Sequence, residues 1–264
     1  MPQVPRLREA RLALQDHVAT LTLDRPERRN ALSPTMLSGL LEGLTWCREE
    51  PQVRVVVLTG TGDRAFCAGA DLATFAGEGA ALERHRERGA FVDLFLRLRS
   101  LGKPVVARVN GHALAGGFGL ACSCDLMVAA DHAMFGTPEV NVGVWPMMIQ
   151  AILRRELPRK VLMEMVMLGE RWTAAQMRDW GLANRVVPGT DLDSATATLA
   201  GALAAKSPAV MRLGKDSFYR QEDLAFEAAL DYLHGQLALV AETEDSREGA
   251  RAFLEKRTPR WSGR

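Results

Sequence analysis

The chain has 264 residues, of which 47% are hydrophobic and 25% charged, and its formal net charge at pH 7 is +1. This balance excludes the basic face of a nucleic-acid-binding domain and the polybasic surface that holds a protein on an anionic membrane. A chain of this length and hydrophobic content can bury a sizeable core, and it predicts one large domain with a smaller appendage.

Strand and helix signals alternate through the first half of the chain. Runs of β-branched residues favour strands buried on both faces, and Ser33-Pro34 is typical of a helix N-cap with proline in the first turn. We expect, in chain order, a hairpin over 12–23, a helix over 34–50, a strand over 53–59, a glycine-rich loop over 60–71, a helix over 81–99, a strand over 105–109, a buried helix over 116–123 and a strand over 126–130. This alternation predicts the α/β class.

The pattern changes near residue 191, after which helical signals follow one another without a strand. We expect helices over 191–205, 207–220, 223–240 and 244–255. The sequence thus predicts an α/β core over 1–205 and a C-terminal helical region over 206–264. The last helices carry apolar stripes that a lone helical hairpin could not bury, so they pack either on a partner subunit or on the core of the same chain.

Two glycine-rich loops are the first candidates for chemistry. The segment 66–71 (FCAGAD) follows a buried strand, and the segment 111–117 (GHALAGG) follows another and continues into a buried helix. Small side chains leave backbone N–H groups accessible, and two such groups that converge on one point form an oxyanion hole. For each loop taken alone, ordinary turn chemistry is the alternative interpretation.

Glu139 is the candidate acid or base. It follows a strand and a proline turn in the segment FGTPE at 135–139, and apolar side chains surround it in the sequence. Partial removal from water would raise its pKa toward neutrality, which suits a general base. The alternative is an exposed turn glutamate.

The remaining reactive residues carry weaker signals. The four cysteines form no CxxC pair and the five histidines show no HxxxH spacing, so we expect neither a disulfide framework nor a bound metal. No apolar run approaches the ~18 residues of a membrane span, and the first residues do not look like a signal or transit peptide. We therefore expect a cytoplasmic protein that binds neither membrane nor nucleic acid.

Taken together, these motifs resemble the enoyl-CoA hydratase/isomerase (crotonase) family. The likeness runs nearly end to end, and its most specific parts are FCAGAD at 66–71, KPVVARVNGHALAGG at 103–117, Cys124-Asp125, FGTPE at 135–139 and Gly181-Leu182-Ala183 before Val186-Val187-Pro188. The resemblance implies a fold of the α/β class, a crotonase-like spiral of stacked ββα units with a C-terminal all-helical oligomerisation region. It implies a homo-oligomer, either a trimer or a dimer of trimers.

The resemblance also implies an acyl-CoA site. Ala70 and Gly116 match the residues whose N–H groups hold the thioester oxygen in the family, and Glu139 matches the second of two hydratase glutamates. The first glutamate falls on Gly119, which has no side chain. A double-bond shift needs one base, so the resemblance slightly favours Δ3-Δ2 enoyl-CoA isomerisation. The alternatives are a single-glutamate enoyl-CoA hydratase and a CoA-binding scaffold without turnover.

The residues that bind coenzyme A in the family transfer only in part. The usual lysine of the 25–30 loop falls on Glu27, so Arg28 or Arg29 would bind phosphate in its place, and a second basic position falls on Ala73. The other implied CoA positions are Ala68, Asp71, Phe253 and Lys256, of which the last two would reach a neighbouring subunit's CoA.

Bulky side chains flank Pro146 in the segment after Val144. Many relatives have a glycine-rich turn after the corresponding proline. We expect Trp145, Met147 and Met148 to line or narrow the acyl pocket beyond Glu139, with Gly119 in the same substrate pocket. The CoA thioester would be the substrate, and no separate cofactor is implied.

Overall fold

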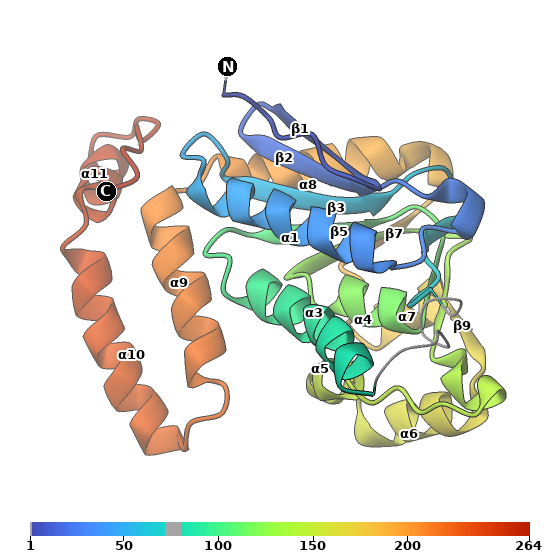
Figure 1. Cartoon of the computed structure of the whole chain (residues 1–264). Helices are drawn as coiled ribbons and strands as arrows, with labels where there is room; N and C mark the ends of the chain where they lie inside the picture. Colours follow the sequence, from blue (N-terminus) through green and yellow to red (C-terminus); the bar gives the residue numbers. More distant parts are fainter. Residues whose placement is uncertain (1, 72–80) are drawn as a thin grey trace.

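The computed structural model describes residues 2–71 and 81–264, and within them the strands form two sheets (Figure 1). Ala73 lies outside the described residues. The six-stranded sheet has the order β1 (Ala10–Gln15), β2 (Val18–Leu23), β3 (Val55–Gly60), β5 (Val105–Val109), β7 (Leu126–Ala130) and β10 (Arg185–Val187). The four-stranded sheet has the order β4 (Ala65–Cys67), β6 (His112–Leu114), β8 (Met134–Gly136) and β9 (Arg171–Thr173).

Some of the helices pack on the large sheet, and others lie beyond it. In chain order they are α1 (Pro34–Glu49), α3 (Ala81–Arg99), α4 (Gly116–Cys122), α5 (Gln150–Glu156), α6 (Arg159–Leu168), α7 (Ala174–Asp179), α8 (Leu192–Ala204), α9 (Pro208–Gln221), α10 (Phe226–Ala241) and α11 (Glu244–Leu254). Short 3-10 helices are η1 (Pro26–Arg28), η2 (Pro138–Val142) and η3 (Gly189–Asp191). The predicted hairpin, the helix with its Ser33 N-cap, and the strands at 105–109 and 126–130 are confirmed.

The central strands of the large sheet are buried on both faces, as their β-branched sequence predicts. In β3, Val55 and Val57 pack in one apolar cluster with α8, while Val56 and Leu58 join the main core with α1 and α3. Figure 1 shows α8 on one side of the sheet and α1 on the other. The sheet is parallel from β2 to β10, which places the carboxyl ends of its inner strands at one edge.

The small sheet contains the strands that sequence patterns did not show. The structure places β4 inside the segment predicted as a loop over 60–71, and β6 inside the glycine segment before α4. Each has three residues, which is too short for a period of two to stand out from a turn. Their pairing matters for function, because β4, β6 and β8 are parallel neighbours.

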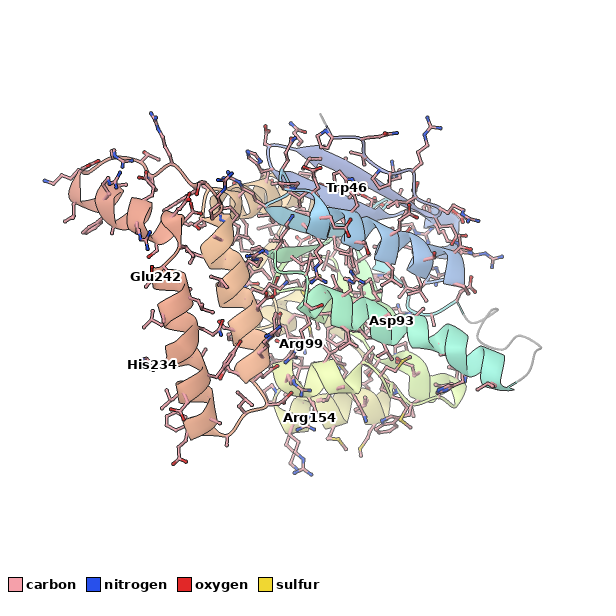
Figure 2. All side chains as sticks on the ribbon, turned by 60° about the vertical axis from the view of Figure 1, so that its left-hand side comes forward. Trp46, Asp93, Arg99, Arg154, His234 and Glu242 are labelled. Carbon is pink, nitrogen blue, oxygen red and sulfur yellow. The ribbon has the colours of Figure 1, made fainter. Side chains whose placement is uncertain are left out.

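The last three helices extend away from the two sheets. Of the three, α9 is joined to the core by ion pairs and hydrogen bonds: Lys215 Nζ lies 2.7 Å from Asp125 Oδ2, and the Tyr219 hydroxyl donates to Asp125 Oδ1 at 2.7 Å. Arg99, at the end of α3, donates to the Tyr219 carbonyl at 2.6 Å, and Figure 2 shows it at this junction, with His234 farther out on α10. The helix α8 covers the large sheet, so the extended part begins after it.

Large apolar side chains remain exposed on this C-terminal region. In α10, which the structure describes throughout, Ala229 is the single buried residue. The exposed apolar residues of α9 to α11 and their connections are Phe218, Leu224, Phe226, Leu230, Leu237, Leu239, Phe253 and Leu254. The core of the same chain therefore does not cover the apolar stripes. Among the described residues, no helix has both the length and the apolar character needed to cross a bilayer.

Candidate active site

Three neighbouring strand ends bring the predicted catalytic positions to one edge of the small sheet. The strands β4, β6 and β8 run parallel, with Cys67 paired to Ala113 and Leu114 paired to Gly136. Ala70, Gly116 and Glu139 follow the ends of these three strands within two or three residues. Since the carboxyl ends of parallel strands meet at the same edge, the register alone gathers these positions.

The backbone at Ala70 points its N–H away from the neighbouring segment. Ala70 forms a parallel bridge with Leu32: the Leu32 N–H donates to the Gly69 carbonyl at 2.8 Å, and the Asp71 N–H donates to the Leu32 carbonyl at 3.1 Å. In such a bridge the residue between the two bonds turns its own N–H to the opposite side. Among the residues that the structure describes, none accepts a hydrogen bond from Ala70 N–H.

The second donor is the first N–H of α4. Ala115, just before it, has φ 51° and ψ −129°, a conformation that residues with a side chain rarely adopt. Its own N–H is bonded to the Gly136 carbonyl at 2.9 Å, which holds this peptide in place. Gly116 N–H has no acceptor within the described part of the chain. A backbone strained in this way just where a donor is set free indicates a functional site.

The two donors lie side by side because glycine lets the loops touch. A Cβ built on Gly116 would lie 3.6 Å from the Ala70 nitrogen, so the two loops are in contact at the donors. A Cβ on Gly69, whose φ is +97°, would lie 2.7 Å from the Ala115 Cβ and 3.1 Å from the Gly116 nitrogen. Any side chain at Gly69 would force the loops apart. The two N–H groups, which have no acceptor among the described residues, therefore lie on loops that touch, as the donors of an oxyanion hole must.

Among the residues that the structure describes, Glu139 is the candidate base at this strand edge. It lies in η2, three residues after β8, and burial raises the pKa of its carboxyl to about 7, with its own backbone N–H acting in the opposite direction. Its Oε2 is buried and has no hydrogen-bond partner among the described residues. The alternative interpretation from the sequence, that Glu139 is an exposed turn residue, is therefore wrong. A carboxylate that is half-ionised at neutral pH, with one oxygen left without a partner, can take up and return a proton.

The thiol in the first glycine loop does not compete for this role. Burial raises the pKa of Cys67 to about 12, so the group stays protonated at neutral pH. All four cysteines are buried and free.

The space beside Gly119 is filled by an unexpected residue. A Cβ on Gly119 would lie 2.7 Å from the Ile149 Cβ and closer still to its Cγ2. Beyond the adjacent residues of α4, among them Phe118, the three nearest heavy atoms belong to Ile149 and none to Trp145. A side chain at 119 thus has no free path toward a substrate while Ile149 keeps its position. Sequence reasoning missed Ile149 because it comes from a different segment, at the start of α5.

The bulky segment after Glu139 divides into a fixed and an open part. Trp145 packs on the core, and its indole Nε1 donates to Gln150 Oε1 at 2.8 Å. Met147 is 67% exposed and Met148 is also exposed, so neither lines an enclosed pocket within the single chain. Val142 is exposed as well, which leaves it outside the apolar surroundings that the sequence predicted for Glu139. The pocket roles of Trp145 and Met147 stay predictions.

The segment predicted to meet the CoA phosphates is held by residues that the motif did not single out. Asn30, 1% exposed, donates its amide to the Thr61 and Ala65 carbonyls, and the Arg25 guanidinium lies 3.1 Å from Asp71 Oδ2. Asp71 therefore joins two loops through Arg25. Sequence could not show these pairs, whose members lie tens of residues apart.

The other predicted CoA positions are accessible. Arg28 and Arg29 are exposed at the end of η1, and the Arg29 carbonyl accepts the Ala68 N–H at 3.1 Å, which places Ala68 beside the arginine pair. Phe253, at the end of α11, is 83% exposed, and Lys256 is exposed with φ 54°. Their contact with CoA stays a prediction.

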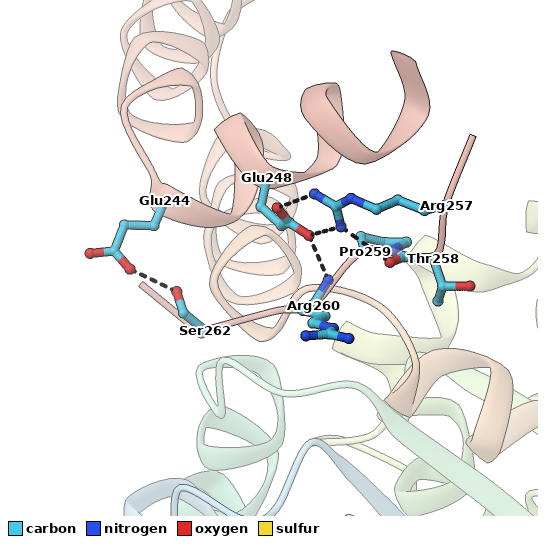
Figure 3. A pocket seen from close by; sticks show the side chains of 7 residues that line it. All are labelled: Glu244, Glu248, Arg257, Thr258, Pro259, Arg260 and Ser262. Atoms are coloured by element: carbon cyan, nitrogen blue, oxygen red, sulfur yellow. Dashed lines mark hydrogen bonds and ion pairs between the residues drawn. The ribbon is translucent and has the colours of Figure 1, made fainter. Parts of the chain in front are cut away.

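A surface concavity near the C-terminus has a different chemistry (Figure 3). The Arg257 guanidinium binds both oxygens of Glu248, at 2.6 and 2.9 Å, and the Arg260 N–H donates to Oε1 at 2.8 Å. Its lining residues are Glu244, Glu248, Arg257, Thr258, Pro259, Arg260 and Ser262. These charged groups satisfy one another and hold the tail on α11, so we assign them to folding.

Comparison with known proteins agrees with this geometry. Residues 13–264 match the family model described as enoyl-CoA hydratase/isomerase. A Thermus thermophilus protein with the provisional name enoyl-CoA hydratase is 41% identical over 93% of this chain and 97% of its own. The 2,3-dehydroadipyl-CoA hydratase of Escherichia coli is 36% identical over 95% of this chain and 97% of its own. The crystal structure of an enoyl-CoA hydratase from Mycobacterium smegmatis has a TM-score of 0.93 at 36% identity, covering 96% of this chain and 99% of that chain. The chain therefore belongs to the enoyl-CoA hydratase/isomerase family and is an acyl-CoA enzyme of that type.

Proposed function

We propose that this enzyme moves a proton next to the thioester of an enoyl-CoA, using one glutamate, and that it favours Δ3-Δ2 isomerisation. The observation that carries the proposal is the buried carboxylate of Glu139, at the strand edge that also holds two N–H groups. Among the described residues, neither its Oε2 nor these two N–H groups have a hydrogen-bond partner. One acid–base group is sufficient for a double-bond shift, because the proton it removes is the proton it returns.

The two N–H groups would act on the thioester oxygen. When a proton leaves C2 of a 3-enoyl-CoA, the electron pair of the C–H bond moves into the thioester and makes its oxygen negative. Ala70 and Gly116 would donate to that oxygen, and fixed donors of this kind stabilise the charge without having to reorient. Removing one such donor typically costs roughly 10²–10³ in rate.

Glu139 would carry the proton between the two carbons. Its carboxylate takes the proton from C2, which leaves a dienolate, and the resulting carboxylic acid gives a proton to C4. The double bond then lies between C2 and C3, in conjugation with the thioester. A pKa of about 7 serves both halves of this cycle, because acid and base forms are present in similar amounts at neutral pH.

Hydration of a 2-enoyl-CoA is the second candidate. The names of similar proteins favour it, including the 2,3-dehydroadipyl-CoA hydratase of Escherichia coli. Glu139 would then have to activate water and also manage the proton that reaches C2. Two groups share this work more easily than one, and we therefore place hydration second.

We also propose that the chain works as a trimer or a dimer of trimers in the cytoplasm. The exposed apolar side chains of α9 to α11 support an oligomer, because a surface of this kind is stable when a partner covers it. In such an assembly Phe253 and Lys256 would reach the CoA bound by a neighbouring subunit, while Arg28 and Ala68 would meet the CoA of their own chain.

Two absorbance measurements test the reaction. A 3-enoyl-CoA should gain the absorbance of the conjugated thioester when the enzyme is added, and crotonyl-CoA should lose it more slowly. Faster loss from crotonyl-CoA than gain from the 3-enoyl-CoA would make hydration the main activity. No change with either substrate, although CoA thioesters bind, would favour a scaffold and overturn the proposal.

A further inference from the structure

We propose that Ile149 limits the active site to one carboxylate, because its side chain occupies the place that a side chain at position 119 would need. This inference rests on the proposed function for its catalytic part, whereas the packing on which it is built does not depend on any activity. Ile149 would thus be a positioning residue that selects for one-base chemistry.

The contact is specific to the Ile149 side chain. The three heavy atoms nearest to a Cβ at position 119 all belong to Ile149: Cγ2, then Cβ at 2.7 Å, then Cα at 3.7 Å. The first two are closer than real Cβ atoms come to other groups, while the last is an ordinary contact. Removing both Cγ2 and Cβ from residue 149 would therefore be enough to make room.

Ile149 has little freedom to move aside. It is 4% exposed and caps the N-terminus of α5, where its carbonyl accepts the N–H groups of Ile152 and Leu153. The residues before it are fixed by the bond from the Gln150 N–H to the Pro146 carbonyl at 3.1 Å and by the Trp145 indole on Gln150. A larger residue at 119 would have to displace this turn and part of the core.

Position 119 matters because of where it lies on α4. It comes three residues after Gly116, and residues three apart share a face of a helix. A side chain at 119 would therefore lie one turn along α4 from Gly116, on the helix face that position 116 shares, and a second acid there would alter the proton transfer. The Ile149 side chain puts an apolar group in that place.

The packing is tested with a double-mutant cycle on melting temperature. Gly119→Ala should lower Tm by about 2–10 °C in the wild-type background, as overpacking of a core does. In an Ile149→Gly background the same change should leave Tm unchanged or raise it. Leu162→Ala, at a buried residue of α6 that contributes none of the three atoms nearest to a Cβ at 119, is the matched control and should show additive effects. Equal losses in the two backgrounds would overturn the proposal.

The catalytic part is tested by adding the acid. We expect Gly119→Glu combined with Ile149→Gly to hydrate crotonyl-CoA at least tenfold faster than Ile149→Gly alone, since an added acid–base group contributes roughly 10²–10⁴ at best. A folded double variant with no gain would overturn this part. A wild-type enzyme that neither isomerises nor hydrates would instead refute the proposed function, and the Tm cycle would still decide the role of Ile149.

Discussion

The site around Ala70 and Gly116 and the C-terminal helices differ in how far a single chain covers and fixes their groups. At the site, the backbone on either side of Ala70 and Gly116 is fixed by contacts and hydrogen bonds. Their own N–H groups have no acceptor among the described residues. On α10 the surplus is apolar surface, with Leu230 and Leu237 exposed. A single subunit thus holds the two candidate donors in place by itself, while its last helices leave apolar side chains uncovered.

Loss of the base should have the largest effect, and it concerns the site alone. Glu139→Gln keeps the shape and removes the proton acceptor, so we expect turnover to fall by roughly 10²–10⁴ while the affinity for acyl-CoA changes little. Steady-state rates and titration of a CoA thioester measure the two quantities. A variant that keeps more than about a tenth of the wild-type rate would show that Glu139 is not the base.

The same variant has a pH signature. Burial raises the pKa of Glu139 from 4.5 in the unfolded chain to about 7, so the folded state holds this proton more tightly. The resulting stabilisation is fully present below pH 4.5 and is lost as pH rises through 7. Relative to wild type, Glu139→Gln should therefore gain stability as pH rises from about 4.5 to about 7, with little further change above pH 7. Over the same range, wild-type kcat/KM should rise as the base ionises.

The next largest effect is expected at the ion pair that joins α9 to the core. Lys215→Met removes the cation that faces Asp125 at the base of α9, where both side chains are largely buried. Breaking such a pair from one side typically costs about 3–5 kcal/mol, and urea unfolding would measure the loss. Lys206→Met, at an exposed lysine before α9, should change stability by no more than about 0.5 kcal/mol. Similar losses in both variants would contradict a role for Asp125 in holding α9.

Assembly is tested on the exposed helix. Leu237→Asp places a charge on the apolar face of α10, and we expect it to weaken the oligomer while the subunit stays folded, as seen by light scattering and circular dichroism. Leu96→Asp, at a similarly exposed position on α3, should leave the mass of the oligomer unchanged. A monomeric wild-type chain would contradict the proposal that the apolar face of α10 packs against a partner subunit.

The C-terminal tail should give the smallest effect. Hydrogen bonds from the Arg257 side chain and the Arg260 N–H lower the pKa of Glu248 from 4.5 to about 2. Its contribution to stability is present above pH 4.5 and disappears as pH falls through 2, but exposed ion pairs contribute little. Glu248→Gln should lower Tm slightly at pH 7 and not at all near pH 2. A large loss of Tm at pH 7 would mean that the tail is an integral part of the fold.

Local chemistry determined much of this protein. The β-branched run in β3 predicts burial on both faces, Ser33-Pro34 predicts the start of α1, and the small residues around Ala70 and Gly116 predict loops with accessible N–H groups. Glu139 could be selected because apolar neighbours in the sequence indicate desolvation. These features depend on residues that are close together in the chain, so they could be predicted from the sequence. The resemblance to the family then indicated that they belong to one site.

Tertiary structure decided the rest, because it depends on contacts between distant segments. The three-residue strands β4 and β6 exist through pairing with their neighbours and show no period of their own. The ion pair of Arg25 with Asp71 joins loops 46 residues apart. Above all, the sequence showed that Gly119 lacks a carboxylate, but only packing showed that Ile149 stands in its place, because the fold alone brings the start of α5 against α4.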